Sequence, residues 1–348
     1  MNLHELPMIL FTVIAQMCVG MFIILGATQL WLSAKADSTT VDRLTLPILY
    51  VIGPALVFGL IASMFHMNDV MHVLNVIRHW QSSWLSREII VGVGFAGAGF
   101  LFAVMQWFRI GSRALRQALG LITAVIGVAL VFVMSMIYTS LRSVPAWHTW
   151  VVPFQFFATT IMLGAAAVAA AIGVMTVIRQ RAARSKVSPV PVPPRAVKNT
   201  TDPKGRPRSL RDRLGFTRNI TEINAPASPE EWTYSVRLVR ACSVVSALAA
   251  VGVLISYTMH IQNLATNPSP AATASLAVYS GLFFWARLVL LALGAIVLGA
   301  LVYRIAGKAM LEKPAPLAAL VTLTFFLILV AEFMGRSLHY ASMMRIGI

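Results

Sequence analysis

The chain has 348 residues, of which 58% are hydrophobic and only 11% are charged, and its mean hydropathy is +0.78. A soluble globular protein carries roughly a quarter charged residues, so this composition excludes a soluble enzyme and a disordered protein. The formal charge of +16 would suit nucleic acid, but half of the Lys and Arg residues lie between Arg179 and Arg240. Because the positive charge is local, we expect no nucleic-acid partner. The composition predicts a polytopic membrane protein.

Eight stretches are long and apolar enough to cross a membrane, since a spanning helix needs about 20 mostly apolar residues. They are residues 7–33, 44–66, 88–108, 115–139, 151–178, 237–262, 276–302 and 315–338. The predicted fold is an all-α integral membrane protein, a bundle of eight transmembrane helices. Residues 1–178 hold helices 1–5, residues 179–236 a linker, and residues 237–348 helices 6–8.

The predicted linker is basic and rich in proline, with Pro189, Pro191, Pro193 and Pro194 close together. Such a composition is typical of a flexible segment without a packed core. We expect it to lie in the cytoplasm against anionic membrane lipids. A docking site for a soluble partner is the alternative.

The positions of Lys and Arg predict the orientation, because they are enriched in cytoplasmic loops. If the N-terminus is outside and the helices alternate, 22 of the 28 Lys and Arg residues fall on the inner connections. Trp80, Trp84 and Trp147 then lie at outer helix ends, where interfacial tryptophans are common. We therefore predict a multi-pass protein of the bacterial inner membrane with both termini on the outer, periplasmic side.

Ionisable residues inside membrane spans are costly and mark functional sites. On this topology they gather at the outer ends of the helices, and the inner halves contain almost nothing comparable. The outer set is Glu5, His66, Glu88, Tyr138, His260, Glu332, Arg336 and His339. Arg287 is predicted near the midplane of the seventh span, paired with Glu332 or Glu88. Glu332 and Arg336 are one helical turn apart, which favours an ion pair within their helix.

The cysteines and histidines limit the cofactors. Cys18 and Cys242 both lie in apolar runs and cannot supply a four-cysteine cluster, so iron–sulfur chemistry belongs to another chain. All seven histidines are predicted at the outer side, which excludes a pair of haems that carries electrons across the membrane. One outer haem bound by His66 and His260 is an alternative, and no other metal site is predicted.

A shallow site with a histidine and a carboxylate suits a quinol, whose oxidation releases two electrons and two protons. His66 closes the second span and Glu88 opens the third, so we predict that the two lie close together. Histidine accepts a proton near neutral pH, and a partly buried glutamate can be tuned to do so. We predict His66 and Glu88 as hydrogen-bonding and proton-accepting groups. The supporting residues are Arg287, Tyr138, Glu332 and Arg336. The simpler alternatives are an interfacial histidine bonded to its loop and a carboxylate at a helix start.

Several short blocks, spread in order over nearly the whole sequence, carry a family resemblance. They are residues 4–7 (HELP), 11–13 (FTV) with Gln16, 62–66 (ASMFH), 83–89 (SWLSREI), 285–288 (WARL), and 332–336 (EFMGR) with 339–340 (HY). Together they resemble the membrane anchor subunit of dimethyl sulfoxide reductase-type complexes, the DmsC family. The long basic linker departs from the family pattern and leaves the partners and the terminal acceptor open.

The resemblance implies a haem-free, eight-helix anchor that oxidises menaquinol in anaerobic respiration. Electrons would pass to a four-cluster iron–sulfur subunit and then to a molybdopterin catalytic subunit, which reduces dimethyl sulfoxide or a related acceptor. The terminal reduction would not occur on this chain. The family's quinol-site histidine and glutamate correspond to His66 and Glu88. Two other functions are a secondary transporter that binds an anion at Arg287, and a passive membrane tether without quinone chemistry.

Overall fold

In a computed structural model the described residues are 5–65, 79–184 and 225–346, and they contain helices and no strand. The elements are α1 (Leu6–Ser33), α2 (Ser38–Met64), α3 (Trp84–Phe108), α4 (Arg113–Thr139), α5 (Val151–Arg184), α8 (Pro229–Thr266), α9 (Pro270–Val278), α10 (Leu282–Leu291), the π-helical turn η3 (Ala292–Leu298), α11 (Gly299–Ala306) and α12 (Ala315–Ala341). Because α10, η3 and α11 form one continuous span, eight helical spans in the described part are long and apolar enough to cross a membrane. The predicted all-helical bundle is confirmed.

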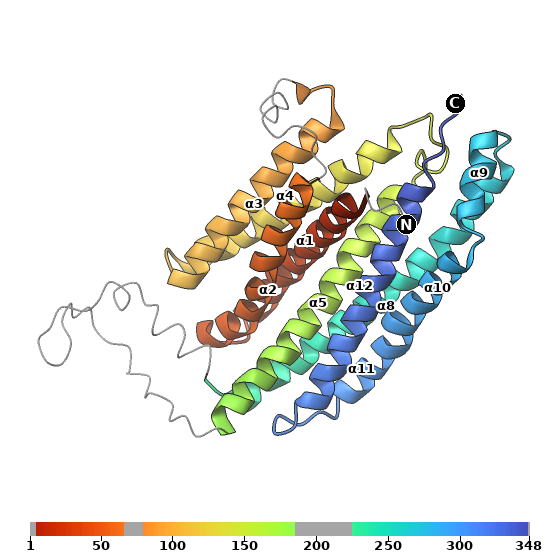
Figure 1. Cartoon of the computed structure of the whole chain (residues 1–348). Helices are drawn as coiled ribbons and strands as arrows, with labels where there is room; N and C mark the ends of the chain where they lie inside the picture. Colours follow the sequence, from red (N-terminus) through yellow and green to blue (C-terminus); the bar gives the residue numbers. More distant parts are fainter. Residues whose placement is uncertain (1–4, 66–78, 185–224, 347–348) are drawn as a thin grey trace, which may run out of the picture.

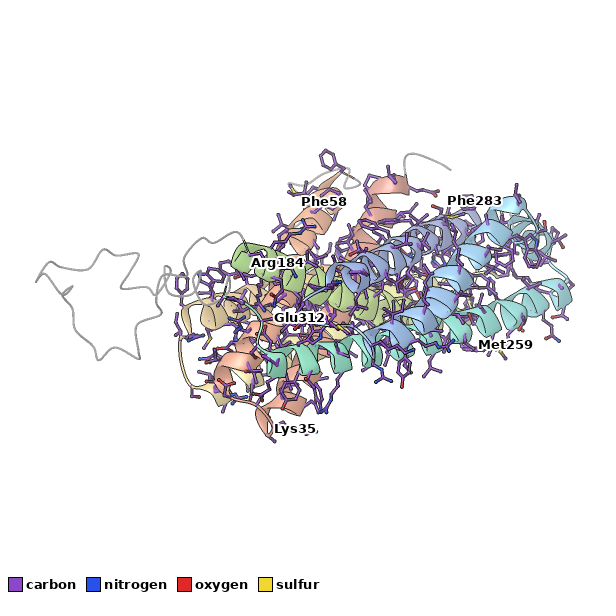
Figure 2. All side chains as sticks on the ribbon, turned by 90° about the horizontal axis from the view of Figure 1, so that it is seen from below. Lys35, Phe58, Arg184, Met259, Phe283 and Glu312 are labelled. Atoms are coloured by element: carbon purple, nitrogen blue, oxygen red, sulfur yellow. The ribbon has the colours of Figure 1, made fainter. Side chains whose placement is uncertain are left out.

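Helices α1 and α5 form the centre of the bundle (Figure 1). Helices α2, α3 and α4 lie on one side of this pair, and α8, α10, α11 and α12 lie on the other. The most apolar stretch is 72% buried in both α1 and α5 but only 22% buried in α3. Large apolar side chains at the periphery, such as Phe58, Met259 and Phe283, remain exposed (Figure 2). These outer faces suit contact with lipid chains.

The two central helices cross at a pair of glycines. A Cβ atom added to Gly20 of α1 would lie within 1.9 Å of the main-chain oxygen of Thr160 in α5. A Cβ added to Gly164 would lie 2.5 Å from the carbonyl carbon of Gly20. No side chain larger than hydrogen fits at either position with these backbones, so the close packing of α1 on α5 depends on small residues.

Polar contacts between elements define the two ends of the bundle. At the His339 end, Tyr138 of α4 contacts Tyr340 of α12, and the main-chain N–H of Ile346 donates to Ser143 in the α4–α5 connection at 2.8 Å. At the Glu231 end, the start of α2 contacts the start of α8 through Arg43 and Glu231. The starts of α1, α3, α5 and α10 therefore share the His339 end with the ends of α2, α4, α8 and α12.

Two helices extend well beyond the apolar runs that predicted them. Helix α5 has 34 residues and α8 has 38. At 1.5 Å per residue each is about 50 Å long or more, whereas the hydrocarbon core of a bilayer is about 30 Å thick. Both helices thus continue into the segment 179–236 assigned to the linker, whose residues 185–224 lie outside the described residues.

The seventh span begins later than predicted. The expected start at residue 276 falls inside α9, and α10 begins at Leu282 after a turn over residues 279–281. Gly281 has extended backbone and forms the N-cap of α10. Hydropathy does not register this turn, because Tyr279 and Gly281 are hardly more polar than the helices on either side.

Candidate functional site

Most of the predicted site residues lie at the His339 end, in layers of increasing depth. Tyr138, His339 and Tyr340 are in the last turns of α4 and α12, and Glu88 is in the second turn of α3. Arg336 lies about one turn deeper on α12, and Glu332 a further turn deeper. All six side chains are buried, although charged groups inside a bundle are rare.

Glu88 is the most isolated of these groups. It is 9% exposed, and its carboxylate makes no hydrogen bond or ion pair to any described residue. It lies close enough to Tyr138 and Tyr340 to interact electrostatically with both hydroxyl groups. His66, the predicted partner of Glu88, lies outside the described residues, so their proximity stays a prediction. The same holds for a haem bound by His66 and His260.

The two tyrosines form a rigid pair beside Glu88. Their hydroxyl oxygens are 2.8 Å apart, and Tyr340 also interacts with the side chain of Thr12 on α1. Trp147 holds the last turn of α12 in place, since its indole N–H donates to the carbonyl of His339 at 2.8 Å. Its ring stacks on the His339 imidazole with centroids 5.1 Å apart. The two hydroxyl groups that interact electrostatically with Glu88 are therefore held in fixed positions.

The deeper layer is an ion pair between Arg287 and Glu332. The Arg287 guanidinium approaches the Glu332 carboxylate at 3.3 Å and donates to the carbonyl of Ala331 at 3.2 Å. Glu332 also accepts a hydrogen bond from Thr159 of α5. The guanidinium lies against Gly335, where an added Cβ would be 2.5 Å from Arg287 Nε. Of the two carboxylates predicted for Arg287, Glu332 is the partner.

The predicted depth of Arg287 is wrong. Arg287 is in the second turn of α10, and Glu332 lies about a third of the way along α12 from the His339 end. The depth was counted from a helix start at residue 276, whereas α10 starts at Leu282. Because Glu332 compensates its charge, Arg287 is also not the uncompensated cation that an anion transporter would need.

The predicted ion pair between Glu332 and Arg336 is also wrong. Arg336 instead donates to the Gln16 side-chain oxygen of α1 at 2.9 Å and lies 3.8 Å above the centre of the Phe156 ring. Glu332 has two partners on other helices, Thr159 and Arg287, which draw its carboxylate away from its own helix. Contacts between helices therefore replace the contact within α12.

Several polar atoms at this end have no hydrogen-bond partner among the described residues. They are Gln16 Nε2, His260 Nδ1, Arg287 Nη1, Arg336 Nε and His339 Nε2. A buried polar atom without a partner typically costs 1–3 kcal/mol. Such atoms are therefore available to hydrogen-bond a small polar molecule at the His339 end.

A second group of buried charges lies at the Glu231 end, where the sequence predicted almost nothing comparable. Glu231 accepts from Arg43 at 2.8 Å and from Arg179, so it joins the starts of α2 and α8 to the end of α5. Nearby, Asp42 accepts from Gln106 at 2.6 Å, and Gln106 accepts from Arg116 at 3.1 Å. The expected one-sidedness of the buried charges is thus wrong.

Most residues of this second group, Glu231 among them, escaped prediction because they were assigned to connections, whereas Gln106 and Arg116 lie at the ends of predicted spans. The signals were present: Asp42 and Arg43 directly precede the second apolar run, and Glu231 follows Ser228 and Pro229, a pattern typical of a helix start. The group joins helix ends to one another and contains more cations than carboxylates.

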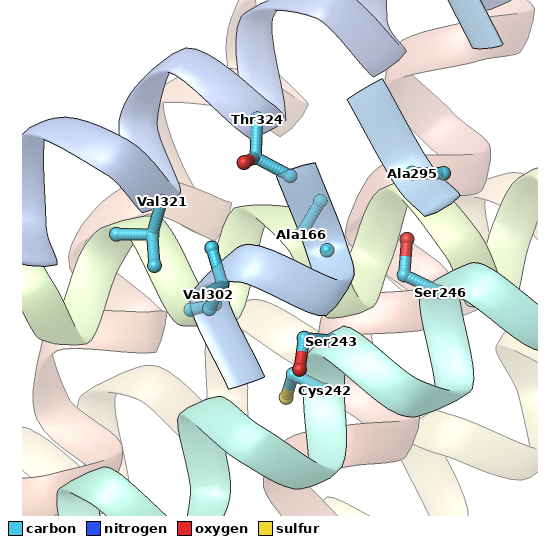
Figure 3. Close-up of a pocket in the computed structure, with 10 residues that line it drawn as sticks. Ala166, Cys242, Ser243, Ser246, Ala295, Val302, Val321 and Thr324 are labelled. Atoms are coloured by element: carbon cyan, nitrogen blue, oxygen red, sulfur yellow. The ribbon is translucent and has the colours of Figure 1, made fainter. Parts of the chain in front are cut away.

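A small cavity lies at mid-bundle between α5, α8, η3, α11 and α12 (Figure 3). Small side chains line it, including Ala166, Ser243, Ser246 and Ala295, together with Cys242 and Thr324. It leaves about 10 Å³ for the centre of a water molecule, roughly the space that one water needs. The cavity is far too small for a quinone ring, so the His339 end is the better candidate for a site.

Comparison with known proteins agrees with the resemblance found in the sequence. A family model described as DMSO reductase anchor subunit (DmsC) matches residues 1–191. The protein is 32% identical over 164 residues to one chain of the anaerobic dimethyl sulfoxide reductase of Escherichia coli K12, and the match spans 46% of this chain and 55% of the relative. It is 28% identical over 166 residues to the corresponding chain of Haemophilus influenzae, with 47% and 57% spanned.

A further relative has a different name. The protein is 30% identical over 145 residues to a subunit of the sulfite dehydrogenase of Allochromatium vinosum, and the match spans 37% of this chain and 43% of the relative. The matched region spans about half the length of the curated relatives. The family model's range includes Glu88 and Tyr138, whereas Arg287 and Glu332 lie beyond it.

Proposed function

The chain belongs to the DmsC family of DMSO reductase anchor subunits, and we propose that it oxidises menaquinol at the His339 end and passes the electrons to a partner subunit. The observation that carries the proposal is Glu88, a buried carboxylate without a partner among the described residues. A buried ionisable group that no neighbour compensates is costly to keep unless it has a function.

In this proposal, Glu88 accepts the proton from one hydroxyl group of the quinol. A buried carboxylate within hydrogen-bond reach is suited to general-base catalysis. Tyr138, held by Tyr340 at 2.8 Å, orients the same end of the ring. His66, which the resemblance places in the quinol site, accepts the second proton. The step releases two protons and two electrons and leaves the quinone.

Arg336 supplies the positive charge near this site. Its guanidinium interacts electrostatically with Tyr138, Tyr340 and His339. A fixed cation stabilises the negative charge that develops on the ring oxygen as its proton leaves. The Arg287–Glu332 pair, one layer deeper, holds α10 against α12 and supports this arrangement.

The electron acceptor in this proposal is an iron–sulfur subunit with four clusters, which in turn feeds a molybdopterin subunit that reduces dimethyl sulfoxide or a related compound. The docking surface is the His339 end, with the 140–150 connection and the C-terminal segment. There, α9 and residues 343–346 border an open hollow of about 740 Å³. The distribution of Lys and Arg supports placing this end on the periplasmic side of the inner membrane.

A second function uses the same site in the opposite direction. The similarity to a sulfite dehydrogenase subunit favours an anchor that reduces quinone with electrons from an oxidising partner. Glu88 would then deliver protons. Assaying the purified complex separately with quinol plus acceptor and with quinone plus sulfite distinguishes the two directions.

The test of the proposal is quinol-dependent turnover of the assembled complex carrying Glu88→Gln. General acid–base catalysis contributes about 10²–10⁴-fold, so we expect turnover to fall by at least about 100-fold. His66→Arg should do the same, and both complexes should still assemble. Glu230→Gln is the matched control, because Glu230 is an exposed glutamate at the opposite end. Unchanged turnover of Glu88→Gln would remove Glu88 from the mechanism.

A further inference from the structure

A cavity at the Glu231 end shares no lining residue with either group of buried charges. It has a volume of about 240 Å³ and lies between the last turns of α5 and the connection that leads into α12. Arg181 and Arg184 line it from α5, and Lys313 lines it from the connection. Figure 2, which views the molecule from below, labels Arg184 and Glu312.

The cavity is strongly basic. Three cationic side chains and one carboxylate, Glu312, line it. Arg184 donates a hydrogen bond to the main-chain oxygen of Glu312, which ties the connection to α5. Arg181 and Lys313 are exposed and have no ion-pair partner among the described residues. Two of the three cations are therefore available to an anionic ligand.

The start of α12 adds to the positive potential. Pro314 occupies the N-cap of this 27-residue helix, the helix has no side-chain cap, and its first turn holds no acidic residue. The helix dipole at such an end attracts anions, although Pro314 and Pro316 have no main-chain N–H group to donate. Pro314, Ala315 and Pro316 all line the cavity, so this end of α12 faces the same space as Arg181 and Lys313.

Apart from Gln180, the remaining lining is apolar and lies where two membrane spans end. Val177 of α5 and residues 314–316 of α12 bring hydrocarbon surface beside the cations. A soluble phosphate ion has no apolar part to contact such a surface, whereas a phospholipid presents a phosphate and the start of its acyl chains together. Basic pockets between transmembrane helices bind the headgroups of anionic lipids in this way.

We propose that this cavity binds the phosphate of an anionic phospholipid, held by Arg181, Arg184 and Lys313. The bound lipid would bridge α5 and the connection before α12, and so reinforce the hydrogen bond from Arg184. The proposal is independent of quinone chemistry, since the cavity and the Glu88 site lie at opposite ends of the bundle.

The test is native mass spectrometry of the full chain with phosphatidylglycerol, cardiolipin or phosphatidylcholine. We expect retention of the two anionic lipids and weak retention of phosphatidylcholine. Arg181→Gln/Lys313→Gln should weaken phosphatidylglycerol binding by about 30-fold, since each of the two cations near a lipid headgroup contributes about 1 kcal/mol. Arg181→Lys/Lys313→Arg keeps both charges and should keep the binding.

The matched control is Arg304→Gln/Lys308→Gln, which removes two exposed cations from the same end that do not line the cavity. It should change binding by less than the cavity variant. Equal losses in the two variants would overturn the proposal, because the attraction would then be diffuse. Release of the lipid by millimolar inorganic phosphate would also overturn it, in favour of a site for a soluble anion.

Discussion

The buried pair Arg287–Glu332 allows a prediction whose size follows from the structure. Arg287 is 2% exposed and Glu332 is 3% exposed, and their closest atoms are 3.3 Å apart. The change Glu332→Gln keeps a group that Thr159 can hydrogen-bond but removes the charge. Arg287 is then left with the Ala331 carbonyl at 3.2 Å and the Tyr257 ring at 4.6 Å.

Breaking a buried ion pair by removing one partner typically costs 3–5 kcal/mol, because the other charge stays buried. Since two neighbours of Arg287 remain, we expect a loss near the lower end, about 3 kcal/mol. In the background Arg287→Met the same Glu332→Gln change should be nearly neutral, because it removes a buried carboxylate that has already lost its cation. The pair should thus show a coupling energy of about 3 kcal/mol.

The assay is reversible unfolding of the purified protein in mixed micelles, followed by circular dichroism for the wild type, both single variants and the double variant. Glu230→Gln, an exposed glutamate, is the control and should change stability by less than about 0.5 kcal/mol. Additive effects of the two single changes would refute the reasoning, since the two side chains would then stabilise the fold independently.

Three further predictions concern other parts of the fold. Gly20→Ala should lower the free energy of unfolding by roughly 3 kcal/mol or more, and with it the thermal midpoint, because its Cβ would meet the Thr160 main-chain oxygen at 1.9 Å. Gly53→Ala, with no atom within 4 Å, should be nearly neutral, and equal effects would contradict the close crossing. Glu231→Gln should cost about 3–5 kcal/mol in the same unfolding assay, since it leaves two buried arginines without their shared anion; a neutral result would count against the cluster. Hydrogen bonds from Thr40 lower the pKa of the Asp37 carboxyl below its ordinary 3.8. Asp37 therefore stabilises the start of α2 above pH 3.8, and this contribution is lost as the pH falls through the lowered pKa. Thermal melts between pH 2 and 6 should show this loss of stability, and Asp37→Asn should remove the pH dependence.

The sequence predicted the helices better than the contacts between them. Runs of about 20 apolar residues located all eight spans, because the bilayer imposes that length. The runs did not locate the helix ends at Arg184 and Pro229, since a helix continues into water wherever its charges find partners. Arg179 and Glu231 are such partners, and they come from segments that the sequence assigned to the linker.

The candidate site was predicted in part. The sequence placed Glu88, Tyr138 and Arg336 at one end, and the described residues confirm that they lie together there. It paired Glu332 with Arg336 because spacing along one helix is visible in a sequence. The pairs Arg336–Gln16 and Tyr138–Tyr340 join residues more than 200 positions apart, and helix packing alone brings these together.

Binding of a fluorescent quinone analogue to the intact complex tests most directly whether Glu88 and Tyr138 form the quinol pocket. Titration should give one saturable site in the wild type and in Glu230→Gln. Glu88→Gln should weaken this binding at least tenfold, and Tyr138→Phe should weaken it by a smaller factor. Undiminished binding to Glu88→Gln, together with loss of binding in Arg287→Met, would contradict the assignment and place the ring in the deeper layer.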